Sequence, residues 1–77
     1  MTYGEVLSYY LEKTGIKRAE LARRVSEILG KEVSRGQITD LCNGKTKEPT
    51  LSRARAIAEA LGTTIQDMCD MMDLDEE

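Results

Sequence analysis

Four polar or small residues close together in the middle of the chain have the right chemistry for recognition. Within the stretch VSRGQITDLCNGK, residues 33–45, they are Arg35, Gly36, Gln37 and Asp40. A guanidinium offers a fixed fork of donors, an amide both donates and accepts, and a carboxylate accepts. These groups are suited to forming hydrogen bonds with a polar ligand, and the glycine leaves room for it to come close.

The residue types needed for catalysis or for metal binding are not arranged to work together. The chain has no His, and Cys42 and Cys69 lie far apart with no CxxC motif, so the usual zinc ligand sets cannot be assembled. No nucleophile stands next to a base. We therefore expect no enzyme activity, no cofactor and no metal, and two reduced thiols that are buried or half-buried.

The length allows one small domain, residues 1–77, with a single modest core. No apolar run approaches the roughly 20 residues of a membrane span, and no basic region followed by an apolar block begins the chain. We expect no membrane partner and a cytoplasmic location.

The net charge of −3 conceals a division along the chain. All 11 Lys and Arg residues lie between Lys13 and Arg55, together with five of the 14 acidic residues, so this segment has a net charge of +6. The other acidic residues lie on its two sides. This division predicts a basic working surface and an acidic tail over residues 73–77, although two solvated faces would give the same count.

Cap signals and apolar spacing predict five helices, at about 3–14, 17–29, 34–43, 50–61 and 64–73. Thr2 with Glu5, and Ser34 with Gln37, have the spacing of capping boxes. The helical spacing predicts these inward-facing residues: Val6, Leu7, Tyr10, Leu11, Leu21, Ala22, Val25, Ile28, Leu29, Ile38, Leu41, Leu51, Ala54, Ile57, Ala58, Leu61, Ile65, Met68, Cys69 and Met72. The fold class is therefore a compact all-α domain of five helices.

Two helices joined by a turn, the second short and exposed, describe a helix-turn-helix. The order AELA, VSRGQIT, NG, a basic loop closing with Pro49, then AIAEALGTTIQDM, resembles the Cro and phage-repressor-like helix-turn-helix family of DNA-binding proteins. The resemblance covers about residues 3–70. It implies a lambda-repressor-like fold and a sequence-specific regulator of transcription that binds double-stranded DNA.

The resemblance implies that the helix at 34–43 enters the major groove, with base contacts by Arg35, Gly36, Gln37 and Asp40. An arginine at the head of such a helix can form two hydrogen bonds with guanine, which contribute about 1–3 kcal/mol of discrimination. Two of the four have alternatives: the Gln37 amide can fold back on the helix cap, and Asp40 can form an ion pair instead of accepting from cytosine.

The resemblance also implies a set of contacts with the DNA backbone. They belong to Arg18, Ser34, Thr39, Lys45, Thr46 and Lys47. Compared with the family, the second helix and the turn after it are longer here. Arg23, Arg24 and Lys31 on this longer arm either extend the phosphate-binding surface or are solvated, and solvation is favoured for Arg24.

The C-terminal segment, residues 63–77, supports an alternative function. Met71, Met72 and Leu74 lie among acidic residues, a pattern that suits an adaptable apolar contact. The alternative is a protein-interaction module, such as an antitoxin, that binds a partner through this segment. A homodimer formed by the same helix would match paired half-sites on DNA.

Overall fold

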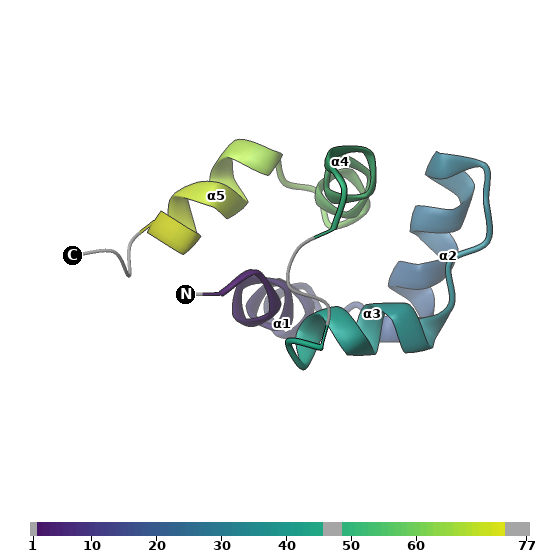
Figure 1. Ribbon diagram of the computed structural model, residues 1–77, viewed down its shortest axis with the longest axis horizontal. Coiled ribbons are helices and arrows are strands. Elements are labelled where there is room, and N and C mark those ends of the chain that lie inside the picture. Colours follow the sequence, from purple (N-terminus) through teal and green to yellow (C-terminus); the bar gives the residue numbers. More distant parts are fainter. Residues whose placement is uncertain (1, 46–48, 74–77) are drawn as a thin grey trace.

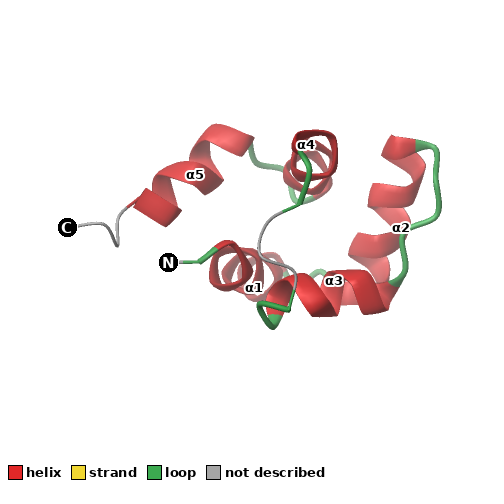
Figure 2. Ribbon diagram, in the orientation of Figure 1, coloured by secondary structure: helices red, strands yellow, loops and turns green. Residues whose placement is uncertain are grey.

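The computed structural model describes residues 2–45 and 49–73, which form five helices and no strand (Figures 1 and 2). Their bounds are α1 Tyr3–Thr14, α2 Arg18–Leu29, α3 Arg35–Cys42, α4 Leu51–Ala60 and α5 Ile65–Asp73. The predicted all-α class with five helices is confirmed. The helices differ from the predicted ranges by at most one residue at an end.

Side-chain caps fix where α1, α3 and α4 begin. The Thr2 hydroxyl accepts from the amide of Glu5 at 3.2 Å, and the Glu5 carboxylate accepts from the amide of Thr2 at 2.9 Å. Ser34 and Gln37 form the same reciprocal pair before α3, and the Thr50 hydroxyl caps α4. These bonds satisfy amides that have no partner inside the helix.

One hydrophobic cluster holds the helices together. Val6, Leu21, Val25, Ile38 and Ile57 are fully enclosed in it. The helix α2 packs against α3 and α4, α1 packs against α3, and α5 covers α1 and α4. Figure 1 shows α3 extending from the base of α2 toward α1, with α4 and α5 on the opposite side of the molecule. This arrangement leaves the outer side of α3 uncovered.

Three residues predicted to face inward are exposed. Ile28 is 41% exposed and Leu51 is 67% exposed, because the last turn of α2 and the first turn of α4 leave a depression that no other described element fills. Cys69 is a free, exposed thiol, whereas Cys42 is half-buried. Cys69 lies next to the buried Met68, at the edge of the face that α5 presents to α1 and α4.

The sequence favoured a solvated Arg24 side chain, and this prediction was wrong. Its guanidinium donates to the Glu20 carboxylate at 2.9 Å and to the carbonyl of Ala60 at 3.2 Å, which ties α2 to the end of α4. Arg23 pairs with Glu20 and Glu27 on its own helix. Hydrogen bonds from Arg23 and Arg24 lower the pKa of Glu20 to about 2. Both arginines are therefore engaged within the fold, and Lys31 is exposed.

Candidate nucleic-acid interface

The N-terminal end of α3 presents polar groups to solvent while its inner side is anchored in the core. Arg35, Gly36 and Gln37 are exposed. Ile38 and Leu41 are 0% and 3% exposed, so they fix the rotation of the helix about its axis. The two buried residues thereby determine which side of α3 faces outward.

Arg35 is an exposed hydrogen-bonding group at this end. Its side chain has no ion pair or hydrogen bond with any residue that the structure describes. Gln37 differs, because its amide oxygen accepts from the backbone of Ser34 at 3.1 Å. Cap formation therefore occupies one of the two polar ends of the Gln37 amide, whereas no described residue binds the Arg35 side chain.

Gly36 has no internal reason to be a glycine. Among the residues that the structure describes, a Cβ atom added there would meet the Ser34 hydroxyl alone, at 3.7 Å, which is ordinary contact. Its φ angle is also not in the left-handed region, so an alanine would fit the backbone. Because alanine favours helix over glycine by about 0.5–1 kcal/mol, the free protein alone would be more stable with alanine at this position.

Arg18 and Thr39 come together although they lie on different helices. The Arg18 guanidinium at the start of α2 donates to the Thr39 hydroxyl of α3 at 3.4 Å. Both side chains are half-buried. This places two of the predicted phosphate contacts side by side, between the start of α2 and the middle of α3.

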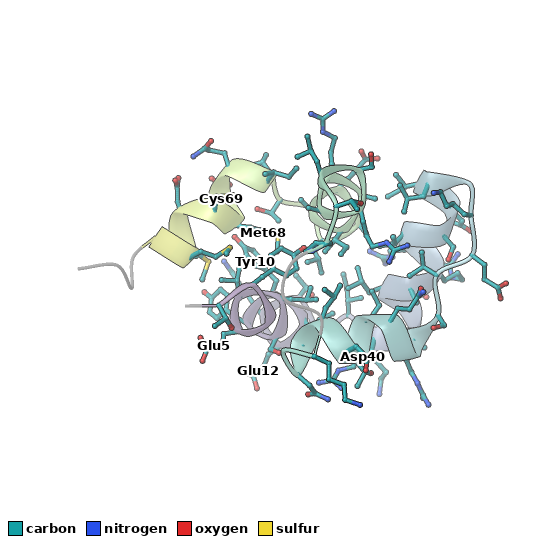
Figure 3. The ribbon with its side chains drawn as sticks, viewed as in Figure 1. Glu5, Tyr10, Glu12, Asp40, Met68 and Cys69 are labelled. Carbon is teal, nitrogen blue, oxygen red and sulfur yellow. The ribbon has the colours of Figure 1, made fainter. Side chains whose placement is uncertain are left out.

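Asp40 and Lys45 lie further along the same region. Figure 3 shows Asp40 on the outer side of α3, away from α1. Its carboxylate forms no ion pair within residues 2–45 and 49–73, so the ion-pair alternative is not seen there. The exposed Lys45 follows α3 after Asn43 and Gly44, and its amide donates to the Asp40 carbonyl at 2.9 Å. Two other predicted phosphate contacts, Thr46 and Lys47, lie outside the described residues.

The C-terminal residues with a predicted partner role are partly covered by the fold itself. Met71 and Met72 are half-buried and pack against the core cluster. Leu74 lies outside the described residues. Beside these half-buried methionines, α5 exposes Cys69 and the polar residues Gln66, Asp67 and Asp70.

Ser26 positions the turn between α2 and α3, a role that its type did not reveal. Its hydroxyl accepts from the amide of Val33 at 2.8 Å and lies 3.2 Å from the Val33 carbonyl oxygen and 2.7 Å from that of Ala22. Val33 directly precedes the cap of α3, and its side chain is buried. The longer turn is therefore attached to α2 just before α3 begins. The one feature of the sequence that could have indicated this role is a serine inside an amphipathic helix.

Gly4 positions the other end of α3, and sequence reasoning missed it as well. A Cβ atom at Gly4 would come within 2.8 Å of the carbonyl oxygen of Cys42 and still closer to that of Leu41. The backbone of α1 therefore contacts the last carbonyls of α3. The signal was a glycine in the first turn of a helix that has a complete capping box.

Comparison with known families agrees with this geometry. A family model described as the Cro/C1-type HTH DNA-binding domain matches residues 6–73. The chain belongs to this family. No curated protein sequence matches it. The resemblance seen in the sequence is confirmed, and α2 and α3, joined by the turn that Ser26 holds, are the two helices that the sequence predicted as its helix-turn-helix. None of the helices within the described ranges has both the length and the apolar character needed to cross a membrane.

Proposed function

We propose that the protein is a sequence-specific regulator of transcription that places α3 in the major groove of double-stranded DNA. The observation that carries this proposal is the exposed head of α3, where an unconstrained Arg35 stands beside a glycine that the fold does not need. Family membership supplies the class of ligand. The N-terminal residues of such a helix are the ones that reach base edges.

Within this proposal the residues divide into readers and positioning contacts. Arg35 binds O6 and N7 of a guanine, and Gly36 lets the helix backbone approach the DNA. Asp40 accepts from a cytosine amine and disfavours other bases at its position. The capped Gln37 reaches a base only through its amino group, because its oxygen is bound to Ser34.

The phosphate contacts surround the readers. Arg18 and Thr39 bind one phosphate together, since a hydrogen bond already joins them. Ser34 at the cap of α3 and Lys45 after this helix bind phosphates at its two ends. Thr46 and Lys47 bind the DNA backbone beyond Lys45. Such contacts provide affinity that depends on salt and fix the register of the helix.

Selection of bound sites from a randomised DNA pool, at two salt concentrations, tests the proposal. We expect one enriched motif that contains a guanine for Arg35. Arg35→Ala should lose about 1–3 kcal/mol of discrimination at that base pair only. Absence of any enriched motif would contradict the proposal.

Lys45→Ala is the matched control, because it removes a cation that we assign to phosphate. It should weaken binding to the selected and to random DNA alike, and lower the slope of log K against log salt by about one. If Arg35→Ala and Lys45→Ala gave the same losses on both DNAs, Arg35 would not be a reader.

The symmetry of the selected motif addresses the second candidate, an association through α5. We propose a homodimer formed by Met71, Met72 and Leu74, because two of these side chains lie at the surface edge of the core. A palindromic motif with half-sites about one helical turn apart would support it. Capture of one stoichiometric protein without any DNA motif would favour the interaction module instead.

A further inference from the structure

Two exposed apolar side chains lie together where α2 ends and α4 begins. Leu51 is 67% exposed and Ile28 is 41% exposed, and both line one depression of about 240 Å³. The half-buried Leu29 and the buried Ala56 line it as well. Single exposed apolar residues are common on protein surfaces, but neighbouring ones that share a depression indicate an interaction surface.

Two opposite charges lie in the same place. Arg55 and Glu59 line this depression, and both are exposed. They follow Leu51 along α4 at intervals of four residues, so the three side chains form one row on the outer side of the helix. Neither charge has an ion pair or a hydrogen bond with any part of the chain that the structure describes. We call Ile28, Leu51, Arg55 and Glu59 the α4 face.

We propose that the α4 face binds a second copy of the chain about a two-fold axis. An axis perpendicular to α4 makes the two α4 helices antiparallel. Arg55 of each copy then lies opposite the partner's Glu59, so two ion pairs form across the axis. The face is therefore complementary to itself in charge, which is the requirement for a contact between identical surfaces.

The same arrangement covers the exposed apolar side chains. Leu51 lies one turn before Arg55, so it reaches the end of the partner's α4, near the partner's Gly62. Gly62 is exposed and has no side chain that would obstruct the leucine. Ile28 adjoins this contact from the last turn of α2. Association therefore removes from water apolar surface that is accessible in the single chain.

The α4 face and the recognition helix lie on different sides of the molecule. Figure 1 shows α4 beside the last turn of α2 along the upper side, and α3 along the lower side. A second copy on the α4 face therefore leaves the head of α3 uncovered. The contact does not depend on the proposed DNA binding or on the proposed association through α5, and its test needs no DNA.

Sedimentation equilibrium of the full chain, at concentrations up to about 1 mM, measures the association. We expect the average mass to rise with concentration from that of one chain toward that of two. Leu51→Glu should weaken association about tenfold or more, because it places a carboxylate in the contact of both copies. Tyr9→Glu is the matched control, since Tyr9 is 43% exposed on α1 and the charge change is the same. It should leave association unchanged.

Charge reversal tests the pairing across the axis. Arg55→Glu alone, or Glu59→Arg alone, places like charges opposite each other and should weaken association about 3- to 10-fold. The double variant, Arg55→Glu with Glu59→Arg, restores opposite charges and should recover association. An equal mixture of the two single variants should associate more tightly than either variant alone, because each supplies the charge that the other lacks.

Three results would overturn the proposal. One is the mass of a single chain at every concentration. Another is association that Leu51→Glu leaves unchanged, which would be assigned to another surface such as α5. The third is a double variant that stays as weakened as the single variants, because Arg55 and Glu59 would then not face each other across the axis.

Discussion

A glycine lies at each end of α3, Gly4 of α1 against its C-terminal end and Gly36 within its N-terminal turn, and the two glycines have very different surroundings. At the C-terminal end, Gly4 of α1 lies so close to α3 that an added Cβ atom would be within 2.8 Å of the carbonyl oxygen of Cys42. At the N-terminal end, an added Cβ atom on Gly36 would meet, within the described part of the chain, only the Ser34 hydroxyl, at 3.7 Å. The first glycine is required by the fold, and the second is not.

This difference separates packing from function without reference to any ligand. Glycine within a helix is less favourable than alanine by about 0.5–1 kcal/mol, so each glycine needs a compensating reason. The contact between α1 and α3 supplies that reason for Gly4. For Gly36 the described residues supply none, and close approach of DNA is the reason that our proposal offers.

The largest expected effect is that of Gly4→Ala. Because a methyl group cannot fit against two backbone carbonyls, the variant should lower the free energy of unfolding by about 2–3 kcal/mol. Urea denaturation followed by circular dichroism measures this change. Glu12→Ala, at an exposed position of the same helix, is the control and should change stability little. If Gly4→Ala were neutral, the two glycines would not differ in the way described.

A smaller effect is expected at the opposite end for Ser26→Ala. The substitution leaves the Val33 amide without its partner, so unfolding should become easier by about 1–2 kcal/mol. Hydrogen exchange should show the Val33 amide losing protection. Ser52→Ala, exposed on α4, provides the matched control. An unchanged exchange rate at Val33 would mean that Ser26 does not hold the turn.

Local patterns were sufficient for much of the fold. Capping boxes, such as those at Thr2 and Ser34, depend on residues three positions apart, and the buried stripe of a helix depends on residues three or four apart. Both patterns can therefore be recognised in the sequence itself. The prediction that Ile28 and Leu51 face inward was wrong, because the exposure of a side chain depends on whether another element covers its turn of the helix. Helical spacing contains no information on that cover.

The candidate site divides in the same way. The sequence identified Arg35 and Gly36 as an exposed helix head because cap and stripe define the outer side of α3. It did not identify Ser26 or Gly4, because their roles rest on contacts with Val33 and with the end of α3. Positioning residues of this kind act across elements and show only in three dimensions.

The central claim, that DNA approaches the head of α3 at Gly36, is tested most directly by measuring stability and DNA affinity of Gly36→Ala together. Our account predicts that the free energy of unfolding rises by about 0.5–1 kcal/mol, while affinity for the selected DNA site falls about tenfold because the added methyl group crowds the DNA. A variant that gained this stability and bound the selected site as tightly as the original protein would contradict the account.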